Sequence, residues 1–318
     1  GAQFWSVYVP AELAGAESAQ AVQVQIDLVQ RIVAHHRGVF ELADTADDIV
    51  RIHRAGRIAS MIGMEGGEAI SANLAVLRQF RRAGVLYMTL CHGRTTSWTD
   101  SATDAPRHGG LSAFGEEVVG EMNRIGMIVD LSHVSHDAMR DALRVSRAPA
   151  IFSHSSAYAL TPHPRNVPDD VLRLVRDNGG VVMVNFYPGF VSEDVRRWSA
   201  ARAGEEARHK ALHPDDPEAA SAALAEWVGA NPRPAARVSD VADHIEHIRD
   251  VAGADSIGIG ADFDGVPFVP DGLEDVASYP ALFAELMRRG WSDADLAKLA
   301  GGNLLRALRE VERVAARS

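Results

Sequence analysis

The chain contains 318 residues, of which 47% are hydrophobic, so it can bury a large core. Its 32 Lys and Arg against 43 Asp and Glu give a formal net charge of −11, which excludes the basic surface expected of a protein that binds nucleic acid or an anionic membrane. No apolar run reaches the roughly 18 residues of a membrane-spanning segment. The single cysteine, Cys91, excludes an internal disulfide framework and, with no recognisable signal peptide, favours a cytoplasmic location.

Short apolar runs alternate with amphipathic segments from the first residues onward. Runs rich in β-branched residues predict strands, and apolar residues three or four positions apart predict helices. The expected strands are residues 2–9, 57–64, 84–90, 126–132, 149–153, 181–187 and 256–261. The expected helices are residues 17–36, 45–54, 71–82, 113–125, 137–146, 169–177, 193–212, 217–229, 238–252, 273–289 and 292–316. Strands that alternate with helices in this way imply a parallel sheet.

The alternation predicts an α/β fold, namely a (β/α)8 barrel of the TIM type formed by residues 1–318 as one domain. Seven strands are one fewer than such a barrel contains, so we expect the first strand to lie in an upstream segment of the native protein. Residues 191–236 interrupt the rhythm and predict a helical insertion or lid over one rim. Two histidines there, His209 and His213, could form a metal pair, but we favour a solvated helix face.

Polar side chains follow six of the predicted strands at matching places. His133 and His154 end two successive strands that one helix-length segment separates, so their side chains should point to the same rim. Glu65 ends an earlier strand and is followed by two glycines, which let a ligand or another backbone segment come close. The remaining strand ends carry His92, Asn185 and Asp262.

A carboxylate and two or three histidines at one barrel rim form a donor set that suits a hydrolytic zinc site. Each histidine alone could equally cap a loop, and it is their repetition that favours a metal. Asp262 could then move a proton to the leaving group, and Arg165, in the loop after His154, could pair with a substrate carboxylate. We interpret Cys91 as a small buried residue rather than a nucleophile.

Several segments, taken in order, resemble the membrane (renal) dipeptidase family of dinuclear zinc peptidases, in its bacterial form. The resemblance runs from residue 1 to about residue 310 and is poor mainly near 191–236. The segments are residues 64–67 (MEGG), 130–135 (DLSHVS), 152–158 (FSHSSAY), 165–170 (RNVPDD), 183–186 (MVNF), 262–265 (DFDG) and 272–275 (GLED). Seven motifs in matching order are far more specific than any one of them.

The resemblance implies a (β/α) barrel that binds two zinc ions per chain, bridged by Glu65. His133 and His154 match the two terminal ligands of one ion, and His92 matches the histidine that contacts the scissile carbonyl group. Arg165 matches the arginine that holds the carboxylate of the substrate, and Asp262 matches the aspartate that moves the proton. The implied reaction is attack of a metal-bridging hydroxide on the peptide bond of a small dipeptide, including L-Xaa-D-Xaa dipeptides.

The chain departs from the family pattern at one place. The family takes two further ligands of the other zinc ion from a His-x-Asp motif on its first strand, and no such motif precedes Glu65. We expect these ligands in the upstream segment. The alternatives are a related amidohydrolase-type metal hydrolase that acts on a lactone or an N-acyl amino acid, and a non-catalytic binding protein if the motif is truly absent. A homodimer is compatible with the sequence, which does not determine the oligomeric state.

Overall fold

The structure, a computed structural model, describes residues 1–13 and 15–318. In this part of the chain eight strands form one parallel sheet, whose main path runs in the order β1-β3-β4-β5-β6-β7-β8. The strands are β1 (Ala2–Tyr8), β2 (Phe40–Leu42), β3 (Ile58–Glu65), β4 (Val85–Thr89), β5 (Ile128–Asp130), β6 (Ile151–Phe152), β7 (Val181–Val184) and β8 (Ile257–Ile259). The seven predicted strands are confirmed, and their ends differ from the predicted ends by at most a few residues.

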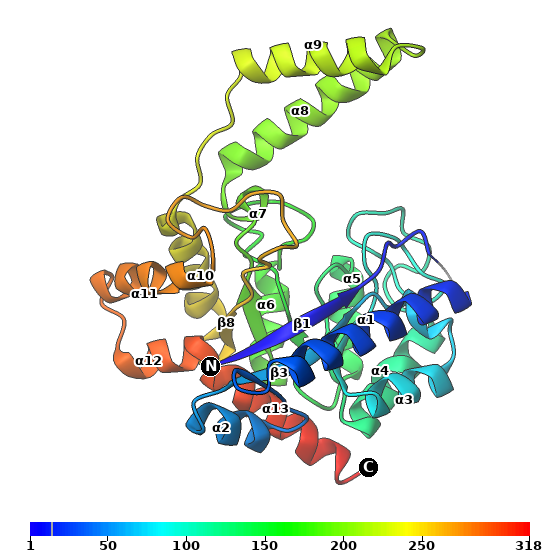
Figure 1. The fold of residues 1–318 in the computed structure, drawn as a ribbon, viewed down its shortest axis with the longest axis vertical. Coiled ribbons are helices and arrows are strands. Elements are labelled where there is room, and N and C mark those ends of the chain that lie inside the picture. Colours follow the sequence, from blue (N-terminus) through cyan, green and yellow to red (C-terminus); the bar gives the residue numbers. More distant parts are fainter. Residues whose placement is uncertain (14) are drawn as a thin grey trace.

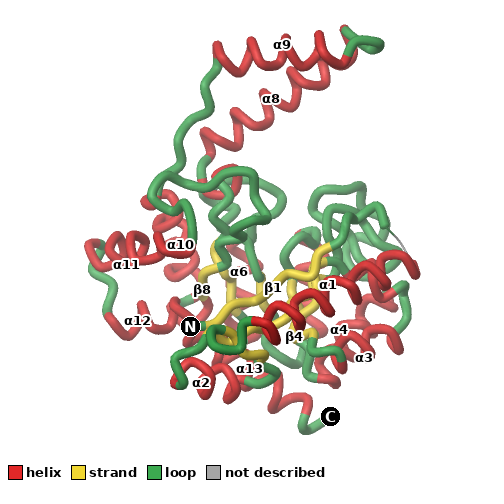
Figure 2. Tube along the Cα trace, in the orientation of Figure 1, coloured by secondary structure: helices red, strands yellow, loops and turns green. Residues whose placement is uncertain are grey.

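The sheet has the strand order of a TIM-type barrel. Successive strands pair in parallel, and the connecting helices lie on the outside of the sheet (Figures 1 and 2). Among the described residues, β1 and β8 form the two ends of the order, and each pairs with one neighbour. Strand β2, which pairs with the start of β3 through Phe40 and Ile58, was not predicted. Three residues are too few to show the alternation that identifies a strand.

Residues 1–13 and 15–318 form thirteen α-helices, besides short 3₁₀ and π turns. They are α1 (Gly15–His35), α2 (Ala46–Arg54), α3 (Leu74–Arg82), α4 (Ala113–Ile125), α5 (His136–Val145), α6 (Asp169–Asn178), α7 (Pro188–Val191), α8 (Glu193–Leu212), α9 (Pro217–Ala230), α10 (Val238–Ala252), α11 (Tyr279–Arg288), α12 (Asp293–Ala297) and α13 (Asn303–Ala315). Side-chain caps place several helix starts: Ser112 accepts a hydrogen bond from the backbone of Gly115, and Ser135 accepts one from Ala138.

The prediction of one continuous helix over 292–316 was wrong. α12 and α13 are separated by a π-helical turn, Lys298–Gly302, in which Gly301 has a φ of 150°. Residues with a side chain rarely adopt this backbone conformation, whereas glycine does so readily. Gly301 therefore allows the break between α12 and α13. The predicted helix over 273–289 likewise begins later, at Tyr279, after a short 3₁₀ turn.

The barrel interior is filled by side chains from alternate strand positions. Met61, Ile128, Ile151 and Val181 form one buried cluster that α13 covers with Leu308 and Val311, besides other residues. The Tyr87 ring occupies the space beside Gly63, where an added Cβ would lie 2.1 Å from the ring. A larger buried cluster packs the outer faces of the strands against the surrounding helices. This packing fixes the strand ends, and therefore the positions of the side chains that follow them.

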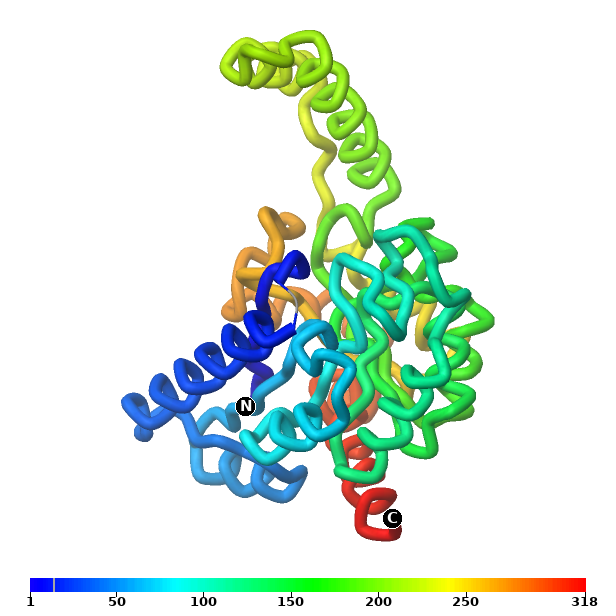
Figure 3. The backbone as a smooth tube through the Cα atoms, turned by 90° about the vertical axis from the view of Figure 1, so that its right-hand side faces the viewer, coloured from blue at the N-terminus to red at the C-terminus, as the bar shows by residue number. Residues whose placement is uncertain are grey.

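Helices α8 and α9 form a hairpin that extends away from the barrel (Figures 1 and 3). Both helices were predicted, but they do not cover the rim as a lid would. The ring centroids of Trp198 on α8 and Trp227 on α9 lie 6.2 Å apart. The Trp198 indole also donates a hydrogen bond to the backbone carbonyl of Asn231. The assignment of the whole chain to one domain stays a prediction. In residues 1–13 and 15–318 no helix combines the length and apolarity needed to cross a bilayer.

Candidate metal centre

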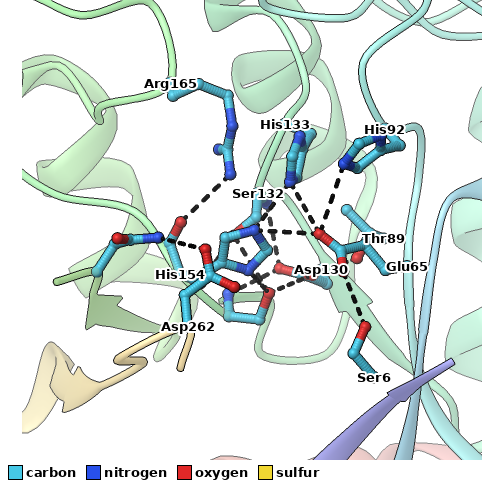
Figure 4. Close-up of polar contacts among 12 residues, drawn as sticks. Ser6, Glu65, Thr89, His92, Asp130, Ser132, His133, His154, Arg165 and Asp262 are labelled. Carbon is cyan, nitrogen blue, oxygen red and sulfur yellow. Dashed lines mark hydrogen bonds and ion pairs between the residues drawn. The ribbon is translucent and has the colours of Figure 1, made fainter. Parts of the chain in front are cut away.

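Three side chains from three strand ends converge at the C-terminal rim of the barrel (Figure 4). Glu65 is the last residue of β3, His133 follows β5, and His154 follows β6. Oε1 of Glu65 lies 3.0 Å from Nε2 of His133 and 3.3 Å from Nε2 of His154. The two Nε2 atoms are 2.8 Å apart. These are the residues that the sequence analysis singled out, and the structure brings them together.

The backbone at this rim is specialised for close approach. His133 has a φ of 72°, a left-handed conformation that is uncommon for a residue other than glycine and that turns the chain between β5 and α5. Gly66 has a φ of 118°, and an added Cβ there would lie 2.5 Å from the Glu68 carboxylate. The glycine after Glu65 is therefore required by the local backbone, which agrees with the interpretation of the sequence.

Burial and the contacts among these three side chains shift the pKa of each of them. Burial alone would raise the pKa of Glu65, but its hydrogen bonds with His133 and His154 outweigh burial and hold that pKa well below its ordinary value. Burial lowers the pKa of His133 well below its ordinary value, and the Arg165 charge adds to this effect. Burial also opposes the charged form of His154, but the Glu65 carboxylate overcomes it and raises the His154 pKa. A buried cluster with opposed shifts of this kind is typical of a functional site.

The donor set fits a divalent metal ion of the zinc type. Two imidazole nitrogens and one carboxylate oxygen face a common point, and all three atoms lie within 4.8 Å of one another. Zinc binds these donor types, and a catalytic zinc site has three protein ligands and one open position. This is the only group of its kind found in residues 1–13 and 15–318. His209, by contrast, lies on α8 with Glu205 as its acidic neighbour at 3.6 Å and belongs to no such group.

His92 lies beside this cluster, in the loop after β4. Its ring centroid is 4.2 Å from that of His133, and its Nε2 is 3.8 Å from Oε1 of Glu65. Burial lowers the pKa of His92, which favours the neutral imidazole. Its backbone N–H donates to Glu68, and Tyr8 packs edge-on against its ring at 4.8 Å. Glu68 and Tyr8 could not be identified from the sequence, because only the folded chain brings them to His92.

Arg165 points toward the cluster from the loop between β6 and α6 (Figure 4). Its side chain is almost fully buried, with 3% exposure, and burial lowers its pKa to about 10. The hydrogen bonds that its guanidinium group makes to described residues, Ser155 Oγ and the His154 carbonyl, are both 3.5 Å long. A buried cation with such weak partners favours an anionic ligand.

Asp262 approaches the cluster from the end of β8 and has a φ of 61°. Its Oδ2 accepts a hydrogen bond of 3.1 Å from the Asn185 amide, which lies at the end of β7. Burial raises the pKa of Asp262, because the ionised carboxylate is less well solvated there. Both residues were expected at strand ends, but their contact could not be predicted from the sequence.

A parallel barrel that gathers imidazoles, a carboxylate and a buried arginine at its C-terminal rim defines a barrel hydrolase of the metal-dependent class. The family model for membrane dipeptidase, Peptidase family M19, matches residues 1–318. The chain therefore belongs to the membrane dipeptidase family. A solved structure of family M19, 28% identical to this chain, is a metallopeptidase, so the chain is a hydrolase of the dipeptidase type, as the sequence motifs predicted.

Individual relatives agree with this assignment. Dipeptidase tcpJ of Claviceps purpurea is 44% identical, over 99% of this chain and 68% of its own length. The crystal structure of the probable dipeptidase PvdM from Pseudomonas aeruginosa is 28% identical, has a TM-score of 0.86, and covers 99% of this chain and 86% of that one. A metallopeptidase from Rhodobacter sphaeroides, liganded with a phosphinate mimic of the dipeptide L-Ala-D-Ala, is 25% identical, has a TM-score of 0.79, and covers 97% of this chain and 86% of that one.

Proposed function

We propose that the chain is a zinc-dependent dipeptidase whose metal is held by Glu65, His133 and His154. The observation that carries this proposal is the convergence of Glu65 Oε1 and the two imidazole Nε2 atoms, all within 4.8 Å of one another. Zinc bound by such a donor set lowers the pKa of a water molecule and polarises a carbonyl group. The other residues of the rim then bind the substrate and handle its protons.

We propose, from the family resemblance, that Glu65 takes part in a site for two zinc ions. Its Oε1 faces His133 and His154, whereas its Oε2 accepts a hydrogen bond of 2.8 Å from Ser6 on β1. Because its two carboxylate oxygens face different neighbours, Glu65 would be able to hold one ion through each oxygen. We propose Glu65 as the bridging ligand.

Arg165 would bind the free carboxylate of a dipeptide. The guanidinium group is buried, points toward the metal cluster and makes only weak hydrogen bonds to described residues. A carboxylate that pairs with it would place the single peptide bond of a dipeptide near the cluster, whereas a longer peptide would have its terminal carboxylate elsewhere. This arrangement supports selectivity for dipeptides.

His92 and Asp262 would act on the peptide bond from two sides. The lowered pKa of His92 favours the neutral imidazole, which can donate a hydrogen bond to the carbonyl oxygen as negative charge develops there. The raised pKa of Asp262 favours proton uptake, so its carboxylate can accept a proton and deliver it to the leaving amine. Asn185 would hold the Asp262 carboxylate in place through its amide.

The preference for L-Xaa-D-Xaa dipeptides is supported by similarity to the Rhodobacter sphaeroides enzyme bound to an L-Ala-D-Ala mimic. Hydrolysis of L-Ala-D-Ala, L-Ala-L-Ala, L-Ala-D-Ala-L-Ala and N-acetyl-D-Ala by the zinc-loaded protein tests the proposal. We expect both dipeptides to be cleaved, the D-terminal one faster, and the tripeptide to be rejected. Preferential cleavage of N-acetyl-D-Ala would instead favour the N-acyl amino acid hydrolase. The homodimer and the cytoplasmic location stay predictions.

A further inference from the structure

The carboxylate of Asp130, the last residue of β5, is fully buried close to Glu65, His133 and His154 (Figure 4) and is surrounded by donors at the ends of three strands. Its Oδ2 lies 2.5 Å from Thr89 Oγ1 and 2.6 Å from Ser153 Oγ. Its Oδ1 accepts backbone hydrogen bonds from Ser132 at 3.1 Å and Ser153 at 2.8 Å. An ionised carboxylate only accepts hydrogen bonds, so each of its oxygens is satisfied by two donors.

This arrangement fixes the direction of the Ser153 hydroxyl group. A serine hydroxyl has one hydrogen, and the short contact with Asp130 requires that hydrogen to be donated to the carboxylate. Ser153 Oγ also lies 2.8 Å from Nδ1 of His154. Because its own hydrogen is committed, Ser153 can only accept in this second contact. Nδ1 of His154 must therefore carry a hydrogen.

The opposite nitrogen of the His154 ring faces the metal cluster. Nε2 lies 2.8 Å from Nε2 of His133 and 3.3 Å from Oε1 of Glu65. In a neutral ring with its hydrogen on Nδ1, Nε2 presents a lone pair to that point. The backbone N–H of His154 is bound as well, by Ser132 Oγ at 3.0 Å, so both the ring and the main chain are held.

We infer that Asp130 and Ser153 are positioning residues for His154: the Asp130 carboxylate orients the Ser153 hydroxyl, which holds the ring in the Nδ1–H tautomer and leaves Nε2 free to bind the metal. The inference rests on the proposed role of His154 as a metal ligand. Partners of this kind, beyond the ligands themselves, commonly set the tautomer of a metal-binding histidine.

Asp130→Asn and Ser153→Ala should affect the ring differently. In Asp130→Asn, the amide oxygen can still accept from the backbone of Ser132 and Ser153, but its NH₂ group then donates to Ser153 Oγ. The Ser153 hydrogen becomes free to turn toward His154 Nδ1, which moves the ring hydrogen to Nε2, the nitrogen that faces the cluster. In Ser153→Ala, Nδ1 loses its partner but no group forces the hydrogen onto Nε2.

The tautomer is measured directly by nitrogen-15 NMR of histidine-labelled, metal-free protein, with the His154 signals assigned by their loss in His154→Gln. We expect the neutral ring to carry its hydrogen on Nδ1 in the wild type and on Nε2 in Asp130→Asn. A wild-type hydrogen on Nε2, or the same tautomer in both proteins, would overturn the inference. A purely structural role of Asp130 would not move these signals.

Zinc affinity, measured by competition with a chelator, gives a second readout. We expect Asp130→Asn and Ser153→Ala to weaken zinc binding by about 10- to 100-fold. Asp130→Asn should bind zinc less tightly than Ser153→Ala. Ser156→Ala is the matched control: this serine is also fully buried in the loop after β6, and its hydroxyl donates to the Asn185 carbonyl, away from Asp130. Its affinity should equal that of the wild type.

Zinc binding by the wild type and by the variants distinguishes failure of the proposed function from failure of the positioning role. If the wild type binds no zinc at this site, the proposed function falls, and this inference falls with it. If the wild type binds zinc and both variants bind it equally well, the proposed function stands and the positioning role of Asp130 and Ser153 is refuted.

Discussion

Nε2 of His133 and Nε2 of His154 face each other across 2.8 Å, although the two residues come from different strand ends. Two ring nitrogens at this distance need a shared hydrogen or a common cation between them, because their lone pairs repel. Oε1 of Glu65 completes the contact on the third side. The arrangement explains why these three residues, rather than the other histidines of the chain, form the proposed metal site.

Removing one of these imidazoles should remove the metal. We expect His133→Ala to lose zinc from this site and to lose dipeptidase activity with it, because two protein ligands cannot hold zinc against water as three do. Zinc content and hydrolysis of L-Ala-D-Ala are measured together. His35→Ala, which changes an exposed histidine at the end of α1, is the control and should keep both properties. Full activity in His133→Ala would contradict the assignment.

Arg165 should govern substrate binding and not metal binding. Arg165→Ala should raise KM for dipeptides by roughly 30-fold or more, which corresponds to the loss of about 2 kcal/mol from one buried charged contact. Steady-state kinetics at saturating zinc give KM, and elemental analysis gives the metal content, which should not change. Arg140→Ala, which removes a surface arginine paired with Asp170, serves as control. An unchanged KM in Arg165→Ala would remove its proposed role.

Asp262 should act on the chemical step. We expect Asp262→Asn to lower kcat by about 10²- to 10⁴-fold while zinc remains bound, since an amide cannot carry the proton to the leaving amine. The matched control is Asp264→Asn, because Asp264 is an exposed carboxylate two residues away with a similar backbone φ of 68°. If kcat falls equally in both variants, the effect comes from the turn and not from the Asp262 carboxylate.

His244 on α10 should make stability depend on pH. It is 1% exposed, its Nδ1 accepts a hydrogen bond of 2.9 Å from the Ala157 backbone, and burial lowers its pKa to about 3. The unfolded chain binds a proton at the ordinary pKa of about 6.5 and the folded chain does not, so this residue lowers stability as pH falls from about 6.5 toward about 3.

The loss of unfolding free energy can be calculated from the pKa of His244 in the folded and unfolded chains. Between about pH 7.5 and about pH 5, His244 should cost about 2 kcal/mol of unfolding free energy. Urea unfolding of the wild type and His244→Gln at both pH values isolates the contribution of His244, because the two proteins share all other titratable groups. The wild type should lose about 2 kcal/mol more than the variant between the two conditions. Equal losses would show that His244 titrates normally in the folded protein.

The strand ends could be predicted from the sequence because six of the seven apolar runs are followed by a polar residue. Glu65, His133 and His154 each end or follow a buried strand, and parallel strands present these ends on one rim. The predicted strand ends therefore placed the three proposed metal ligands on one rim. It also located the outer helices, because their buried residues recur at helical spacing and their first turns carry capping side chains.

Other features depend on contacts that periodicity does not encode. Strand β2 is three residues long, and it is held by the start of β3 rather than by its own pattern. The break between α12 and α13 arises at Gly301, which the sequence shows only as one of two adjacent glycines. The contact of Ser6 with Glu65 joins residues on two different strands, β1 and β3, that meet only in the folded sheet.

The central claim is that Glu65, His133 and His154 hold zinc, and anomalous X-ray diffraction at the zinc edge from crystals of the zinc-loaded protein tests it most directly. We predict a zinc peak about 2.0–2.1 Å from Nε2 of both His133 and His154, with Glu65 between that ion and a second one. A map with no zinc peak at the two imidazoles would contradict the account.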